Sequence, residues 1–357
     1  MQRLLMGVVA ALAVTAGIAF ALRERIVLGV MERTVVRAMS TSILDGLPDG
    51  IHVALCGAGS PLPDPERSGP CVAVIAGQEL YVVDAGAGSS RVLARMGVPQ
   101  GRIQAVLLTH FHSDHIDGLG ELLMQRWING AHQKRTLVYG PRGLQRVVGG
   151  FRRAYSLDAD YRIAHHGEEV APPSGSGGMA RPFTSPPDGQ QHVVLESGGL
   201  LITAFRVDHD PVVPAVGYRF DYNGRSVVIS GDTKKSANLE AMAREVDLLV
   251  HEALSPALVG LMNRAAARAG RANLEKITAD IVDYHTSPVE AAEIARDVGA
   301  KHLLYYHIVP PLPVAPLEAV FLDGVAEVYE GPVSLGRDGT FLSLPAGSDI
   351  IEERSLL

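Results

Sequence analysis

The sequence has few cysteines and no excess of positive charge. Its two cysteines, Cys56 and Cys71, are too few for a disulfide scaffold or a four-cysteine zinc site. The 357 residues include 32 Lys and Arg against 39 Asp and Glu, a net charge of −7, which argues against nucleic acid as the main partner. Charged residues make up only 20% and hydrophobic residues 47%, which excludes a disordered chain. What the sequence does have is 13 histidines, and their positions carry the functional inference.

The N-terminal segment differs in composition from the rest of the chain. Leu4–Leu22 is a run of nineteen residues without a charge, long enough for a membrane-spanning helix, and Ala19-Phe20-Ala21 could instead end a cleaved signal peptide. We expect residues 1–40 to form a membrane anchor or signal segment with a connector helix, and the protein to be exported, periplasmic or membrane-anchored. The arginines that follow this run favour the opposite of export, an orientation that keeps the rest of the chain in the cytoplasm.

The remaining residues, 41–357, alternate short apolar runs with helical patterns, which predicts one α/β domain. Strands are expected on both sides of a Pro/Gly-rich loop at residues 171–190. Asn223-Gly224 is typical of a tight hairpin turn. This order predicts two β-sheets sandwiched between helix layers. Cys56 and Cys71 lie on neighbouring predicted strands, and they would form a disulfide in an exported domain or remain small buried residues otherwise.

The strongest motif is Thr109-His110-Phe111-His112-Ser113-Asp114-His115, directly after a predicted buried strand. Its four ligand-type side chains lie on one turn, where His110 and His112 can converge on one metal and Asp114 and His115 on a second. Imidazole and carboxylate ligands suit Zn²⁺ with an open position for water.

Three further ligand-type residues, His209, Asp232 and His307, each follow or end a predicted strand. Any one of them alone would more often be a turn residue or a structural histidine. Their common placement at strand C-termini favours the same edge of the sheet as the main cluster. We therefore expect them to complete the metal shells.

The sequence resembles the metallo-β-lactamase superfamily, within it the ribonuclease Z and arylsulfatase-like branch. The resemblance rests on motifs in the family's order across about residues 51–308: LCGAGSP, YVVDAG, THFHSDH, VDHD, GYRF, SGDT, LLVHEA, DYHTS and YYHI. It implies an αββα sandwich of two mixed sheets flanked by helices, preceded here by an N-terminal hydrophobic helix.

The resemblance also implies a dinuclear zinc centre. His110, His112 and His209 would hold the first zinc, Asp114, His115 and His307 the second, and Asp232 would bridge them. Two such metals can hold a bridging hydroxide that is nucleophilic at neutral pH, and Asp114 would then also orient or deprotonate the attacking water. Mn²⁺ or Fe²⁺ fit the same ligands.

His285 lies outside the ligand set, just before a helix start marked by Ser287, Pro288 and Glu290. A histidine there suits contact with an anionic substrate, and the resemblance makes it the general acid or a donor to a phosphate oxygen. Glu252 could orient His285 or be purely structural. Asp84 is interpreted as a partner of a ligand or a turn former.

The sequence departs from the tRNA-processing pattern in one respect. Only the hairpin Asp221–Ile229 separates GYRF from SGDT, where many bacterial members carry a basic arm for tRNA, and the loop 171–190 has Arg181 as its single basic residue. We therefore expect a hydrolase acting on a small anionic phosphodiester or sulfate ester, with nucleic acid disfavoured and a homodimer allowed. The alternatives are a tRNA 3′-processing endoribonuclease and a β-lactamase- or lactonase-like hydrolase of a carbonyl substrate.

Overall fold

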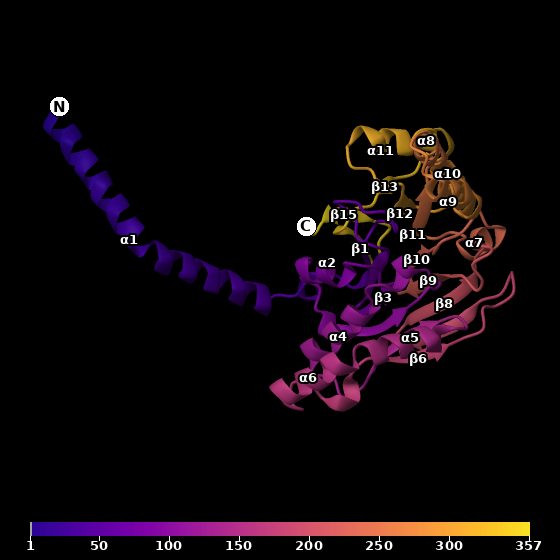
Figure 1. Cartoon of the computed structure of the whole chain (residues 1–357), viewed down its shortest axis with the longest axis horizontal. Coiled ribbons are helices and arrows are strands. Elements are labelled where there is room, and N and C mark those ends of the chain that lie inside the picture. Colours follow the sequence, from indigo (N-terminus) through magenta and orange to yellow (C-terminus); the bar gives the residue numbers. More distant parts are fainter. Residues whose placement is uncertain (1) are drawn as a thin grey trace. The chain divides into compact units, whose positions relative to one another are not determined.

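The computed structural model describes residues 2–357, although the side chains of residues 2–4, 8–19, 21 and 38 lie outside the description. The chain divides into two compact units, Met1–Gly46 and Leu47–Leu357. The first comprises helix α1 (Gln2–Ser40) and the short helix η1 (Ile43–Gly46) (Figure 1). Among the described residues, no helix is both long and apolar enough to cross a membrane. The run Leu4–Leu22, on which the expected anchor depends, lies largely outside the described side chains.

The second unit contains two mixed sheets, one of eight strands in the order β15-β14-β1-β2-β3-β4-β5-β6 and one of seven in the order β13-β12-β11-β10-β9-β8-β7. The first sheet consists of β1 (Gly50–Gly57), β2 (Cys71–Ala76), β3 (Glu79–Val83), β4 (Ile103–Leu107), β5 (Thr136–Gly140), β6 (Gly178–Pro182), β14 (Thr340–Pro345) and β15 (Glu352–Ser355). The second consists of β7 (His192–Ser197), β8 (Leu200–Arg206), β9 (Val216–Tyr222), β10 (Arg225–Ile229), β11 (Leu248–Leu254), β12 (His302–Val309) and β13 (Val333–Leu335).

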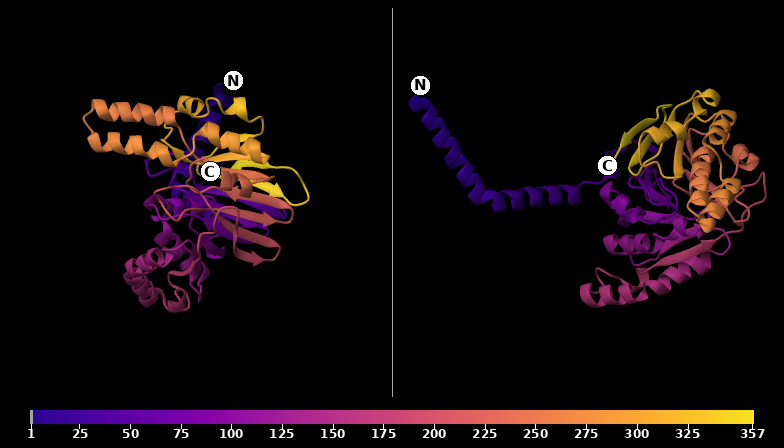
Figure 2. Two further views of the ribbon diagram at one scale, coloured as in Figure 1. Left: turned by 90° about the vertical axis from the view of Figure 1, so that its right-hand side faces the viewer. Right: turned by 45° about the horizontal axis from the view of Figure 1, so that its top comes forward.

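Helices cover the outer faces of both sheets (Figure 2). Those of the N-terminal half are α2 (Ser89–Arg95), η2 (Gln100–Arg102), α3 (Ser113–Ile116), α4 (Leu119–Gly130), α5 (Leu144–Ala154), α6 (Ser156–His166) and η3 (Pro173–Gly175). Those of the C-terminal half are α7 (Ala237–Met242), α8 (Pro256–Arg268), α9 (Ala272–Asp280), η4 (Ile281–Tyr284), α10 (Pro288–Val298), α11 (Pro316–Phe321) and α12 (Val325–Val328). The predicted αββα sandwich of two mixed sheets is confirmed.

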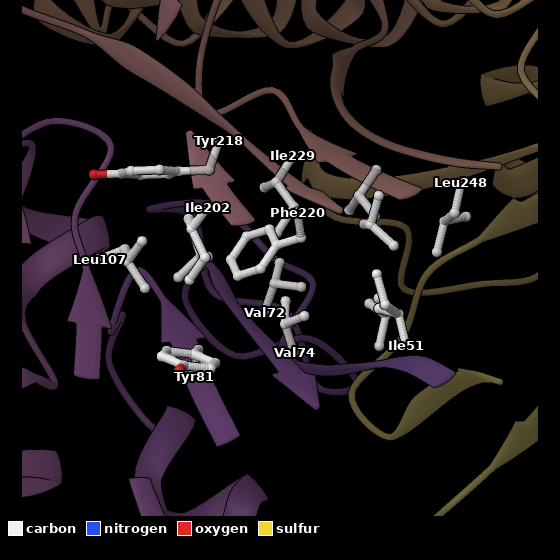
Figure 3. Packing of buried hydrophobic residues seen from close by; sticks show 14 of the residues in the cluster. Ile51, Val72, Val74, Tyr81, Leu107, Ile202, Tyr218, Phe220, Ile229 and Leu248 are labelled. Carbon is white, nitrogen blue, oxygen red and sulfur yellow. The ribbon is translucent and has the colours of Figure 1, made fainter. Parts of the chain in front are cut away.

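The main core lies between the two sheets. Its buried side chains come from the inner faces of both, as Figure 3 shows for Val72, Val74 and Tyr81 on one side and Ile202 and Phe220 on the other. A second apolar cluster joins the outer face of the β7–β13 sheet to α7, α10, α11 and α12. Because both faces of this sheet are covered, β11 and β12 are buried along their whole length.

One segment differs from the sequence prediction. The predicted loop 171–190 contains β6, which pairs in parallel with β5. Met179 and Ala180 of β6 lie within the Pro/Gly-rich stretch, so composition alone indicates a loop. Pairing with the exposed edge of β5 overrides that local preference.

A disulfide joins Cys56 at the end of β1 to Cys71 at the start of β2, which settles the pairing that the sequence left open. The intervening loop carries Ser60, Pro61 and Leu62 into the cavity described below.

Replacing both cysteines by alanine is expected to lower the free energy of unfolding by about 3 kcal/mol, because the disulfide closes a loop of 15 residues and restricts the unfolded chain. Guanidinium titration of the variant and of the wild type under non-reducing conditions measures the difference. Wild-type protein in excess reductant is the control and should lose the same amount; equal midpoints for all three samples would contradict the prediction.

Candidate metal centre

The predicted ligands all lie at one edge of the sandwich, where strands of both sheets end. The THFHSDH segment follows β4 and continues into α3. His209 follows β8, Asp232 follows β10, and His307 lies in β12. Since the carboxyl ends of these strands point to the same edge, residues nearly two hundred positions apart meet there.

The first group consists of His110, His112, His209 and Asp232, whose ligand atoms lie within 4.8 Å of one another. His112 Nδ1 is 3.1 Å from His110 Nε2 and 3.4 Å from His209 Nε2. The Oδ2 atom of Asp232 lies 3.7 Å from His110 Nε2 and 3.8 Å from His209 Nε2. Ligand atoms in a tetrahedral zinc shell are about 3.3 Å apart, given Zn–N distances of about 2.0–2.1 Å, so this group has the dimensions of a metal shell.

The second group consists of Asp114, His115 and His307. His307 Nε2 lies 3.2 Å from Asp114 Oδ2, and His115 Nε2 lies 3.5 Å from the same oxygen. Asp232 Oδ2 is also 3.2 Å from His115 Nε2 and 3.4 Å from His307 Nε2. One carboxylate oxygen of Asp232 therefore faces both groups.

His307 reaches this position through a β-bulge. Glu252 pairs with Tyr306 and Ala253 with Ile308, which leaves His307 as the extra residue of β12, with a positive φ of 46°. A bulge changes the direction in which a side chain points. Here it places His307 toward the ligands of the other sheet, at the cost of a left-handed backbone that non-glycine residues rarely adopt.

Hydrogen bonds hold several ligands in orientation. His115 Nδ1 donates to Asp84 Oδ2 over 2.8 Å, and Asp84 also accepts from the backbone and side chain of Thr109. His209 Nδ1 donates to the carbonyl of Tyr284 over 2.9 Å. Each of these bonds occupies one ring nitrogen, which leaves the other free to bind a metal.

The charges of the groups also suit a metal. Burial lowers the pKa of His209 to about 4 and holds the pKa of His110 well below its usual range, so both imidazoles are neutral, as metal ligands must be. Burial opposes ionisation of Asp232, but His115 and His307 outweigh it and hold its pKa well below the ordinary value. Burial likewise opposes the charged form of His115, but the neighbouring carboxylates outweigh it and raise the pKa of His115 well above its usual range, so this ring would release a proton on binding a metal. The Nε2 atom of His115 is buried without a hydrogen-bond partner. A buried nitrogen without a hydrogen-bond partner that faces the carboxylates of Asp114 and Asp232 is suited to binding a metal ion together with them.

His285 lies beside the proposed ligands, and its side chain contacts Glu252. Its Nδ1 is 3.1 Å from Glu252 Oε1, and its ring is stacked 5.5 Å from that of His307. Glu252 is fully buried in β11, where the same oxygen accepts from the backbone of Thr286 and Thr233. Burial tends to lower the pKa of His285, but the charge and hydrogen bond of Glu252 outweigh it, so the pKa is raised.

A cavity of about 290 Å³ opens above the ligands. Asp114, Asp232 and His307 line its floor together with Tyr284 and His285. Its opposite wall is apolar and comes from the loop after β1, α8, α9 and η4, with Leu62, Met262, Leu274, Ile277 and Ile281. Neither this wall nor the position of Tyr284 in the cavity was predicted from the sequence; the apolar residues at helical spacing in 258–281 were the available signal.

Residues 64–280 match the family model of the metallo-β-lactamase superfamily. The chain belongs to this superfamily. It is 36% identical over 290 residues to a ribonuclease Z of Mycobacterium avium (strain 104), covering 81% of this chain and 96% of that protein. Among solved structures, the short form of human tRNase Z has a TM-score of 0.60 at 21% identity, covering 82% of this chain and 99% of that one. The metallo-β-lactamase fold protein YhfI from Bacillus subtilis has a TM-score of 0.56 at 19% identity, covering 86% and 100%.

These relatives show that the chain is a metal-dependent hydrolase of the superfamily. They also correct the predicted partner: a small anionic ester in preference to nucleic acid is wrong, because the curated relatives are named ribonucleases. The predicted membrane contact gains no support from them. The predicted cleavage of a sulfate ester gains no support from them. The prediction failed because it took the absence of a basic arm at one place, together with a net charge that sums over the whole surface, as a measure of the field near the site.

Proposed function

We propose that this protein is a dinuclear zinc-dependent endoribonuclease of the ribonuclease Z type, which cleaves the 3′ trailer from precursor tRNA. The observation that carries the proposal is the pair of ligand groups that share Asp232 Oδ2. The identity over almost the full length of a curated ribonuclease Z supports the choice of substrate.

His110, His112 and His209 would hold one zinc ion, Asp114, His115 and His307 the other, and Asp232 would contact both. When bound, such ions lower the pKa of water and stabilise negative charge on a phosphate. The chain's own residues account for the remaining chemistry. Asp114 would orient the nucleophile, since it lines the cavity together with Asp232 and His307.

His285 is placed to supply a proton to the leaving oxygen. Its Nδ1 is bound to Glu252, so Nε2 points away from that carboxylate and its N–H is available to substrate. The raised pKa of His285 keeps the ring protonated up to a higher pH, as a general acid requires.

Elemental analysis of the purified full chain, with precursor tRNA assayed on the same sample, tests the proposal. We expect about two zinc ions per chain and release of the 3′ trailer at physiological salt. Two metals with no cleavage of precursor tRNA would overturn the substrate, and one metal or none would overturn the dinuclear centre.

A further inference from the structure

An arginine-bearing helix lies beside the metal centre, and neither the hydrolase chemistry nor the ligand groups use it. Helix α5 and the turn before it carry Arg142, Arg146, Arg152 and Arg153, all exposed, and residues 141–155 contain no Asp or Glu. Of the ion pairs between described residues, none involves these four arginines. The result is a local excess of positive charge on a chain whose net charge is −7.

Acidic residues on the neighbouring helices do not neutralise this excess. Glu121 of α4 pairs with Arg91, and Asp158 of α6 pairs with Arg162. Asp160 of α6 is exposed as well, but it lies on the helix that follows and not on α5. The four arginines therefore face solvent with their charges uncompensated by a partner.

An open groove of about 700 Å³ runs between α5 and the metal-binding loop. Arg146 and Arg153 line it together with Val147, Gly143 and Phe111. Phe111 lies in sequence between the ligands His110 and His112, and a Cβ at Gly143 would stand 3.1 Å from its ring. The groove and the metal centre thus share one loop.

Two glycines, Gly149 and Gly150, lie between Arg146 and Arg153 on the helix. A Cβ at Gly150 would meet nothing within 4 Å, and one at Gly149 would meet only the guanidinium of Arg153. Arg146 and Arg153 are seven residues apart, about 10 Å along a helix, so each can contact a different phosphate of one strand. Without side chains in between, a phosphate backbone can approach the helix closely.

We propose that this groove, formed by Phe111, Arg146 and Arg153, binds the RNA backbone next to the scissile phosphate and takes the place of the basic arm that the chain lacks. The inference rests on the proposed function and names the binding surface for it. Arginines contact the phosphates, and the half-buried ring of Phe111 stacks on a base, the combination by which proteins bind single-stranded RNA.

Charge reversal at both groove arginines, R146E/R153E, tests the proposal. Binding of fluorescently labelled mature tRNA to the zinc-loaded full chain is expected to weaken at least about tenfold at 150 mM salt, and the slope of log K against log salt to fall by about two, one for each lost phosphate contact. The matched control is R95E/R244E, which reverses two exposed arginines outside the groove and should change affinity by less than about twofold.

Hydrolysis of bis(p-nitrophenyl) phosphate by the same samples should stay within about twofold of wild type, since neither arginine touches the ligands. An equal loss of tRNA binding in both double variants, or no loss in R146E/R153E, would overturn the groove. If wild type binds tRNA through the groove but does not cleave precursor tRNA, the proposed function fails and the groove stands.

Phe111→Leu tests the stacking contact separately. We expect about tenfold weaker tRNA binding with unchanged zinc content measured on the same sample. Full zinc content together with wild-type tRNA affinity would overturn the role of the ring.

Discussion

Asp232→Asn is expected to lower turnover of precursor tRNA by at least about 10³-fold and to reduce the bound zinc to one ion per chain or fewer. The reason is that Asp232 Oδ2 lies within 3.2–3.8 Å of imidazole nitrogens from both ligand groups, and a neutral amide is a poor ligand for either metal. Asparagine has nearly the same volume as aspartate, so the buried position remains filled. Elemental analysis and steady-state cleavage of precursor tRNA measure the two effects.

Asp208→Asn is the matched control for this variant. Asp208 lies next to His209 in the sequence but is exposed, with Lys234 Nζ 4.0 Å away. We expect it to keep both metals and most of the activity. Two zinc ions and more than about a tenth of the wild-type rate in Asp232→Asn would show that Asp232 does not contact the two metals.

His285→Ala is expected to lower the rate by about 10²–10⁴-fold while both metals stay bound. His285 contacts Glu252 and lies in the cavity, but none of the seven proposed ligands depends on it for a hydrogen bond in the described residues. Zinc content and single-turnover cleavage separate a chemical role from a ligand role. Loss of one metal would show that His285 is a ligand with Asp232 and His307, the third grouping that the geometry permits.

Glu252→Gln is expected to move the alkaline limit of activity to lower pH. Glu252 raises the pKa of His285 against the effect of burial, so the protonated ring is lost only as the pH rises through that raised value. Removing the negative charge lowers the pKa, and activity should then fall at a lower pH, with a smaller loss at the optimum than in His285→Ala. A pH–rate profile with an unchanged alkaline limb would contradict the positioning role of Glu252.

The parts of the site that the sequence predicted are those set by local pattern. THFHSDH places four ligand-type residues within one turn after an apolar strand, and the strand's burial pattern is visible in its composition. His209 and Asp232 were found because each directly follows a recognisable strand. The capping box at Ser287 was likewise predicted from three neighbouring residues and is present in the structure.

Contacts between residues far apart in the sequence decided the features of the fold and the site that the sequence did not predict. The bulge at His307 exists only because β12 pairs with β11, and β6 forms only because β5 leaves an edge for it. Whether Asp84 would support a ligand or form a turn remained open until the chain folded, because its partner His115 lies thirty-one residues away. The apolar wall of the cavity is another case, since a stripe of apolar residues on α8 and α9 has the same periodicity whether it faces a core or a substrate.

The sequence by itself determined the sandwich of two sheets, the chemical type of the ligands and the strands that present them. Only the tertiary structure decided that Oδ2 is the Asp232 oxygen that faces both ligand groups, that Glu252 contacts His285, and that Arg146 and Arg153 of α5 line a groove with Phe111. The physical reason is that the two kinds of feature depend on different separations between residues. Strand pattern and turn chemistry act between near neighbours along the chain, whereas a metal shell and a local electrostatic field depend on distances in space.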